Sequence, residues 1–401
     1  MARYLACAAA STPYCYFQDD DWIVRPLRSM YANFLRFPEL IHTDTNAFVY
    51  TLTNWQWCFF NDDVHLHACF SWVGTGAFAS QDIVKKFLDQ LGMIPDLDRL
   101  EYAYADMFFT TFANQVPYQL QNELVELPAE YAFSGGDGRI RNKVYMHKAS
   151  KRLYNGLRNI TSTGVNNGTA MPYFETNEIH PVRLRDVRSP CYHDRCLFLT
   201  NVHPFPNPRL FKYLPDVDIT KSEIIHSTIH PSEHFCQHPF SHAVDNRHET
   251  SWQSEQMVNV GEYIGLDILL EIPVRIGISV VFTEMDPIFW GKDIVLEYSL
   301  DGHDYLPVSP SVIAKCAAVL TTKGKQELAR VDTQADGTIV YETDPGLTAS
   351  SSREDPLFRC TWEMPRSLNG KWRFIRWRAL VGALTRWHVN EIEFKELDRR
   401  V

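Results

Sequence analysis

Residues 294–302 read IVLEYSLDG, and this stretch decides the fold of the C-terminal part of the chain. Its first six residues are rich in the β-branched and aromatic side chains that strands favour, and Asp301-Gly302 is a tight-turn signal. Similar runs recur between turns: Tyr263–Leu270, Arg275–Thr283, Thr338–Thr343, Arg373–Leu380 and Val389–Phe394. Short strands separated by turns predict an all-β antiparallel sandwich over residues 223–397.

Residues 1–157 have a different pattern, in which short apolar runs alternate with helical stretches. Ser80 is a good N-cap for an amphipathic helix that ends at Gly92. Further helices are expected at Ala2–Ala10, Arg25–Arg36, Leu100–Asn114 and Lys143–Leu157, and strands at Tyr14–Gln18, Leu40–His42, Ala47–Leu52 and Ala68–Val73. The mixture predicts an α/β domain over 1–157.

Residues 158–222 join the two predicted domains. Asn, Gly, Thr and Pro dominate Asn159–Pro172, and a single apolar run, Cys196–Asn201, lies in the Pro-rich stretch after it. We interpret 158–222 as a linker that partly packs on its neighbours.

Composition excludes several classes of protein. The 401 residues carry a formal net charge of −10, so binding to nucleic acid driven mainly by electrostatic attraction is not expected. No window of 18 apolar residues exists, so no transmembrane segment is expected. Nine cysteines, an odd number in a large chain, do not describe a disulfide framework.

Two groups of His and Cys residues have spacings that metal sites use. His recurs every four residues from 226 to 242 with Cys236 among them, a spacing that would build a zinc site on a helix, but Pro231 and Pro239 argue against one continuous helix. For Cys191 and Cys196, a local disulfide or a chance pair is favoured over zinc.

Three consecutive carboxylates, Asp19, Asp20 and Asp21, directly follow the apolar run Tyr14–Phe17. Carboxylates crowded at a strand end repel one another unless a positive group lies beside them. A divalent cation with oxygen ligands meets that need, and such cations often hold the phosphates of a substrate. The alternative interpretation is a solvated acidic turn.

The order of motifs resembles nucleotide-sugar glycosyltransferases of the GT-A type, with a fungal group as the nearest likeness. The resemblance rests on residues 16–21 (YFQDDD), 72–78 (WVGTGAF) and 104–109 (YADMFF), and it covers residues 2–157. It implies a partial Rossmann-type sheet, a nucleotide sugar as donor and a glycan or glycoprotein as acceptor. Such enzymes use Mn²⁺ or Mg²⁺ beside a DXD-like acidic motif.

The resemblance also implies roles for single residues. Asp19 and Asp21 would hold the metal, and Asp20 would share the contact with the diphosphate. Asp106 would be the catalytic base, a task that suits a carboxylate; the alternative is an acidic residue at a helix N-terminus. Gly74 and Gly76 would let the backbone approach the sugar, or simply end a strand. Trp72 would stack on the sugar, or lie in the core.

One departure from the family concerns the start of the chain. Only 18 residues precede Asp19, whereas a βαβ unit needs about 30. We therefore expect the nucleotide-binding strands to be missing, which would make this chain alone inactive. The resemblance implies a Golgi location for full-length relatives, whose anchor would lie before Met1.

The C-terminal region resembles discoidin or coagulation-factor type C domains. The likeness rests on residues 243–246 (AVDN), 250–254 (TSWQS), 263–267 (YIGLD), 374–378 (FIRWR) and 387–394 (WHVNEIEF), which occur in the family's order. It implies a galactose-binding-like sandwich whose loops at one end bind glycans, lipids or proteins. Some members hold a structural Ca²⁺, and Asp245 would line that region. Trp252, Trp377 and Trp387 are predicted to be core residues.

Two functions follow from these motifs. The leading hypothesis is a metal-dependent glycosyltransferase that moves a sugar from a nucleotide diphosphate to an acceptor hydroxyl and carries a carbohydrate-binding domain. Its rival is a non-enzymatic glycan-binding or surface-binding protein that acts through the C-terminal sandwich. A glycoside hydrolase with an accessory binding domain comes third.

Overall fold

The computed structural model divides the chain into two compact units. Unit 1 comprises Met1–Val187 and Phe205–Cys236, and unit 2 comprises Arg188–Pro204 and Gln237–Val401. The structure describes residues 1–94, 96–127, 137–163, 185–269, 276–283, 293–309, 311–312, 314–322, 325–333, 339–341, 357–368, 370, 372–382 and 385–396. Residues 164–184 of the predicted linker lie outside these residues, and its first six residues, 158–163, are the end of a helix.

Unit 1 is mixed α/β. Its main sheet has the order β1 (Tyr14–Phe17), β6 (Ala77–Ser80), β3 (His42–Thr45) and β7 (Tyr118–Gln121). β1 and β3 pair antiparallel with β6, and β3 and β7 pair parallel. Two small antiparallel pairs accompany it: β2 (Trp22–Ile23) with β8 (Val125–Glu126), and β4 (Cys58–Asn61) with β5 (Leu66–Cys69). Only one of the main-sheet pairs is therefore parallel, whereas a Rossmann-type sheet is mostly parallel.

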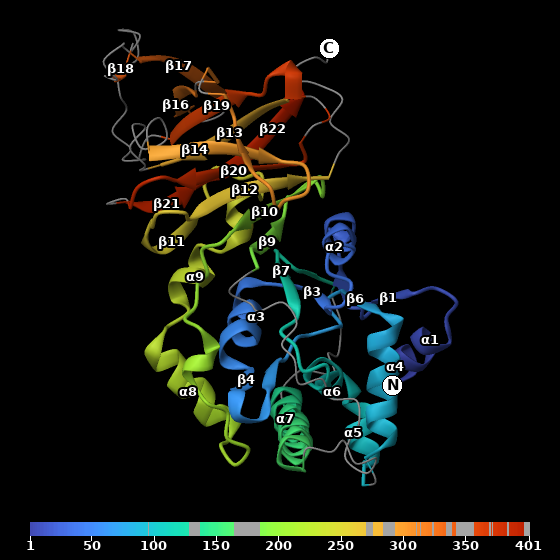
Figure 1. Ribbon diagram of the computed structural model, residues 1–401. Helices are drawn as coiled ribbons and strands as arrows, with labels where there is room; N and C mark the ends of the chain where they lie inside the picture. Colours follow the sequence, from blue (N-terminus) through green and yellow to red (C-terminus); the bar gives the residue numbers. More distant parts are fainter. Residues whose placement is uncertain are drawn as a thin grey trace. The chain divides into compact units, whose positions relative to one another are not determined.

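Helices surround this sheet in unit 1 (Figure 1). They are α1 (Ala2–Ala9), α2 (Leu27–Phe34), α3 (Ala47–Thr51), α4 (Gln81–Gly92), α5 (Arg99–Ala103), α6 (Ala105–Phe112), α7 (Asp137–Thr163), α8 (Ile219–Ile229) and α9 (Glu233–Gln237). α1 packs on α4, and α6 packs on α7. The core between them is strongly aromatic, with Tyr4, Phe87 and Phe109 in mutual ring contact.

Several predicted elements of unit 1 are confirmed and two are wrong. The Ser80 hydroxyl accepts a hydrogen bond from Ile83 N and starts α4, as expected. The segment Ala47–Leu52, predicted as a strand, begins a helix because the Asn46 side chain caps it at Val49 N. The predicted helix Leu100–Asn114 is broken into α5 and α6 at Tyr104, whose backbone (φ −95°, ψ 29°) leaves the helical region.

Unit 2 is a sandwich of two antiparallel sheets (Figure 1). One sheet contains β9 (Val187–Pro190), β10 (Cys196–Thr200), β12 (Tyr263–Ile268), β20 (Phe374–Ala379), β14 (Ile294–Ser299) and β15 (Leu306–Pro307), in that order. The other contains β18 (Ile339–Tyr341), β17 (Lys325–Thr333), β16 (Lys315–Thr322), β19 (Leu357–Glu363), β13 (Ile276–Phe282) and β22 (Glu391–Glu396). β11 (Trp252–Met257) pairs with β21 (Arg386–Val389).

Tryptophans fill the core between the two sheets. Trp252, Trp377 and Trp387 are buried, which confirms their predicted core role. The ring centroid of Trp362 on β19 lies 5.4 Å from that of Trp377 on β20, so the two sheets contact face to face. The segments that the sequence predicted as strands thus form a sandwich.

The predicted linker does not end as expected. Its apolar run Cys196–Thr200 forms β10, whose five residues pair with β12 from Cys196↔Ile268 to Thr200↔Ile264. Residues 205–236 belong to unit 1 and include α8, which packs on the π-helical turn Leu52–Gln56. The chain therefore passes between the units more than once, because two apolar stretches within 158–236 find partners in different cores.

Eight of the nine cysteines form disulfides: Cys7–Cys15, Cys58–Cys69, Cys191–Cys196 and Cys316–Cys360. Cys236 is the free one. The expectation that an odd number describes no disulfide framework is wrong, because one unpaired cysteine accounts for the odd count. The preference for a local disulfide between Cys191 and Cys196 is confirmed.

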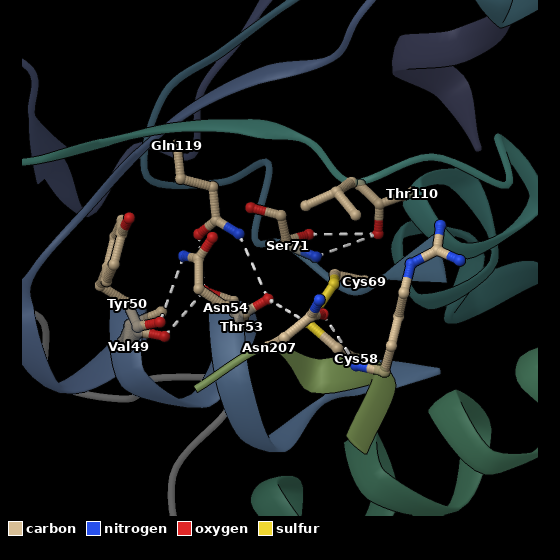
Figure 2. The surroundings of a disulfide bond; sticks show 12 residues. Val49, Tyr50, Thr53, Asn54, Cys58, Cys69, Ser71, Thr110, Gln119 and Asn207 are labelled. Carbon is tan, nitrogen blue, oxygen red and sulfur yellow. Dashed lines mark hydrogen bonds between the residues drawn. A yellow bond between two sulfur atoms is a disulfide. The ribbon is translucent and has the colours of Figure 1, made fainter. Parts of the chain in front are cut away.

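The Cys58–Cys69 disulfide closes the small β4–β5 pair beside a buried polar network (Figure 2). The Thr53 hydroxyl donates to Gln119 Oε1 at 2.6 Å, and Ser71 N donates to Thr110 Oγ1 at 3.2 Å. The first contact pairs a buried hydroxyl of the helical turn Leu52–Gln56, and the second pairs a buried backbone N–H. Among the described residues, no helix is long and apolar enough to cross a membrane.

Candidate functional site

Asp19 lies just after β1 in unit 1 and packs on Gly74. Asp19 N donates to Gly74 O at 2.8 Å, which joins the two segments. A Cβ atom at position 74 would lie 2.0 Å from Asp19 Oδ2, so a side chain there would displace the carboxylate. Glycine at 74 is therefore required by the close approach of an acidic side chain.

Arg3 and Tyr4, both on α1, join Asp19 to Asp106. Arg3 Nη2 donates to Asp19 Oδ1 at 2.5 Å, and Arg3 Nη1 lies 3.8 Å from Asp106 Oδ2. The Tyr4 hydroxyl donates to Asp106 Oδ1 at 2.6 Å. Asp106 is in the first turn of α6, where a carboxylate also interacts favourably with the helix dipole. Residues from three distant segments thus meet around one guanidinium.

The electrostatics of this cluster keep Arg3 charged and Tyr4 neutral. Burial lowers the pKa of Arg3, but the charges of Asp106 and Asp19 outweigh it and raise the pKa overall. Burial, followed by the charge of Asp106, raises the pKa of Tyr4 well above its ordinary value. Tyr4 therefore remains a hydrogen-bond donor to Asp106 over the whole physiological range.

The other two carboxylates of the acidic run point elsewhere. Asp20 is exposed, and Asp21 Oδ1 is buried without a hydrogen-bond partner among the described residues. Those residues contain no group of three or more His, Cys, Asp or Glu side chains able to hold a metal ion. Asp19 is paired to Arg3, and the metal-binding roles of Asp19, Asp20 and Asp21 stay predictions.

Gly76 and Trp72 lie in the same segment as Gly74. Gly76 has φ +113°, a conformation that favours glycine, and its missing Cβ would lie 3.1 Å from the Tyr16 hydroxyl. Trp72 is half-buried, and its ring lies nearly perpendicular to that of Phe70, with centroids 5.0 Å apart. Trp72 therefore packs on the core of unit 1, as the alternative interpretation allowed.

Sequence reasoning missed Arg3 and Tyr4 as members of this cluster. Both lie on a helix that was predicted correctly, but nothing in its sequence indicates that it folds back onto Asp19. The Cys7–Cys15 disulfide, which ties α1 to β1, supplies the missing constraint. A close pair of cysteines that flanks a helix end was therefore the available signal.

A cavity of about 420 Å³ lies elsewhere in unit 1. Its lining includes Tyr14 at the start of β1, Ser80 at the end of β6 and Lys86 on α4. Asp19 follows the opposite end of β1, so the cavity does not contain the acidic cluster.

The His and Cys residues of 226–242 do not form a site. His226 is buried on α8, where its Nδ1 lies 2.6 Å from Ser222 O, and Cys236 lies on α9. Burial lowers the pKa of His226, and a hydrogen bond to Ser222 O opposes this effect only in part. Pro231 separates the two helices, as its position in the sequence indicated.

In unit 2, Asp245 and Glu391 lie beside each other. Asp245 Oδ1 accepts from Arg247 N at 3.0 Å, Asp245 Oδ2 accepts from the Thr250 hydroxyl at 2.8 Å, and Glu391 Oε2 accepts from Asn246 N at 2.8 Å. Burial, followed by the charge of Asp245, raises the pKa of Glu391 to about 9. Glu391 therefore holds a proton at neutral pH. A structural Ca²⁺ near Asp245 stays a prediction of the resemblance.

Comparisons with known proteins give only distant likenesses. No family model matches the chain, and no curated protein matches it. Among solved structures, "CpGH89CBM32-5" from Clostridium perfringens, in complex with GalNAc-β-1,3-galactose, is 11% identical with a TM-score of 0.21. This likeness covers 38% of our chain and 81% of that one.

Two further solved structures are similar at the same level. The family 32 CBM from Clostridium perfringens NanJ, in complex with galactose, is 12% identical (TM-score 0.16) and covers 40% of this chain and 86% of that one. The C-terminal domain of a chitobiase from Bacteroides fragilis is 12% identical (TM-score 0.21) and covers 39% and 78%. Scores in this range do not establish a shared fold, so the sandwich assignment rests on the strand pairing described above.

Proposed function

We propose that this chain is a glycan-binding protein whose C-terminal sandwich holds the sugar. One observation carries the proposal: the segments that resemble discoidin-type domains lie on β11, β12, β20, β21 and β22 of an antiparallel sandwich, with Asp245 and Asn246 in a loop before β11. In domains of this type, the loops at one end bind the ligand. The four disulfides support an oxidising compartment, where extracellular glycans are found.

The contacts of unit 1 also favour glycan binding over catalysis. The carboxylates that a transferase would use, Asp19 and Asp106, are engaged by Arg3 and Tyr4 of the same chain. Arg3 supplies the positive charge that the acidic run needs. The chain therefore stabilises this acidic cluster by itself.

The test is a glycan array probed with the full chain, followed by calorimetric titration of galactose and N-acetylgalactosamine. We expect saturable binding that Asp245→Asn weakens and that Asp106→Asn, a matched change in unit 1, leaves unchanged. The thermal midpoint of both variants must match that of the parent chain. A folded chain that binds no glycan on the array would refute the proposal.

Sugar transfer is the second candidate function, and the observation behind it is that Asp19 lies beside Gly74 and shares Arg3 with Asp106. In that reaction Asp106 would take the proton of the acceptor hydroxyl. The hydroxyl oxygen would then bond to the anomeric carbon of the donor sugar as the nucleoside diphosphate leaves. Calorimetric titration of UDP-glucose and GDP-mannose with Mn²⁺, and then with a chelator, tests this function. Metal-dependent heat that Asp21→Ala abolishes supports it, and no heat from a folded sample excludes donor binding by this chain.

A further inference from the structure

Arg376 on β20 projects from the outer face of its sheet, between two tyrosine rings. Its Cζ atom lies 3.6 Å from the ring centroid of Tyr305 and 5.0 Å from that of Tyr263 on β12. Gly265, its cross-strand partner on β12, places no side chain beside it. The guanidinium plane is therefore held by cation–π contact on this face.

Glu297 on β14 fixes the same guanidinium from one edge. Its Oε2 accepts from Arg376 Nε at 2.7 Å, and its Oε1 accepts from Arg378 Nη2 at 2.6 Å. Burial raises the pKa of Glu297, but the hydrogen bonds from Arg378 and Arg376 outweigh it and lower the pKa overall. Glu297 is thus a permanent anion that orients both arginines.

The remaining donors of Arg376 point away from this anchor. The structure records no hydrogen bond from either Nη atom of Arg376 to a described residue, although the side chain is only 19% exposed. A guanidinium that bonds through Nε alone keeps four N–H groups in one plane, spaced to bind two oxygens of one anion. Because the rotamer of Arg376 is already fixed, ligand binding costs little side-chain entropy.

The surrounding face is positive although the chain is negative. Four arginines and two carboxylates are linked there by ion pairs: Arg188, Arg373, Arg376 and Arg378 with Asp267 and Glu297. The formal net charge of the whole chain is −10. A local excess of positive charge of this kind attracts anionic ligands.

We propose that this face of the sandwich binds the acidic group of a glycan, a carboxylate or a sulfate, through the two Nη atoms of Arg376. Tyr263 and Tyr305 border the site and offer aromatic surface to the sugar ring that carries the acidic group. The inference rests on the proposed glycan-binding function and adds to it a substrate class and a position. A carboxylate and a sulfate each present two oxygens that the two Nη atoms of a guanidinium can bind together. An ammonium group does not match this geometry.

The test titrates three hexasaccharides into the full chain: hyaluronan (carboxylate), chondroitin sulfate (carboxylate and sulfate) and chitohexaose (neutral). We expect the acidic probes to bind, with Arg376→Gln weakening them about tenfold or more, the scale of one lost bidentate contact. Arg376→Lys keeps the positive charge but removes the paired N–H donors of the guanidinium, so it should also weaken binding of the acidic probes. Arg386→Gln on β21, an exposed arginine of the same unit, is the matched control and should change nothing.

Each outcome separates the inference from the function beneath it. Acidic probes bound equally by the parent chain and Arg376→Gln, with unchanged thermal midpoints, overturn the inference. Equal losses in Arg376→Gln and Arg386→Gln mean that general charge attracts the probes, which also overturns it. Binding of the neutral probe alone leaves glycan binding standing and removes the acidic specificity. If no probe and no array glycan binds, both the function and the inference fail.

Discussion

Removing the Cys316–Cys360 disulfide should destabilise unit 2 more than removing the Cys191–Cys196 disulfide of the same unit. The first closes a loop of 44 residues and the second a loop of 5. The chain-entropy relation then gives about 4 kcal/mol for the long loop and about 2 kcal/mol for the short one. Paired substitutions to alanine, Cys316→Ala with Cys360→Ala and Cys191→Ala with Cys196→Ala, make the comparison direct.

For a unit of this size, 1 kcal/mol shifts the thermal midpoint by roughly 2–4 °C. Scanning calorimetry should therefore show a loss of about 8–16 °C for the long-loop pair and about 4–8 °C for the short-loop pair. A thiol count on the unfolded, unreduced parent chain checks the premise, since only Cys236 should react. Equal losses in the two variants, or more than one reactive thiol in the parent chain, would refute the reasoning.

Three further predictions concern single contacts. Gly74→Ala should lower the free energy of unfolding in urea by about 1 kcal/mol, because the new Cβ displaces the Asp19 carboxylate from Arg3. The control Gly92→Ala, whose Cβ meets no atom within 4 Å, should cost nothing. Equal effects of the two substitutions would count against this explanation. The pKa of Glu391 is about 9 in the folded chain, against an ordinary value of 4.5. The stability that its proton contributes is therefore complete below pH about 4.5. Between that pH and pH 9 the free energy of unfolding falls by about 1.4 kcal/mol per pH unit. The urea midpoint should therefore fall between pH 5 and pH 8, and Glu391→Gln should flatten that fall; an unchanged slope contradicts the assignment. Asp267→Ala removes the carboxylate shared by Arg188 and Arg373 and should cost about 3–5 kcal/mol, and Asp267→Leu with Arg188→Met should recover most of it; no recovery would mean that the loss is not electrostatic.

The sequence predicted the elements of both units better than it predicted their connections. The strands of the sandwich were visible because alternating runs end at strong turn signals such as Asp301-Gly302. The passage of the chain between units was not visible, since the short run Cys196–Thr200 has no pattern that identifies its partner strand. Pairing with β12 is a tertiary choice, made by burial of Leu197, Phe198 and Leu199.

Local capping explains the errors within unit 1. Ala47–Leu52 has the β-branched and aromatic composition of a strand, but Asn46 caps its first turn and the segment is helical. The long apolar run from Leu100 was expected to be one helix, but it is two. Composition alone cannot distinguish these cases, because a single cap or a single non-helical residue decides them.

The candidate site in unit 1 was predicted in its acidic half only. Asp19, Gly74 and Asp106 do meet, but the acidic run suggested a metal as the positive partner, and the structure places Arg3 there. A resident guanidinium and a divalent cation satisfy the same electrostatic need, so the motif alone cannot choose between them. What decides is the position of α1, which the Cys7–Cys15 disulfide ties to β1. If a metal is to bind Asp19, Arg3 must first release it. We therefore expect Arg3→Ala to bind Mn²⁺ more tightly than the parent chain in calorimetric titration, and a folded Arg3→Ala chain that binds no Mn²⁺ would show that the acidic run is not a metal site.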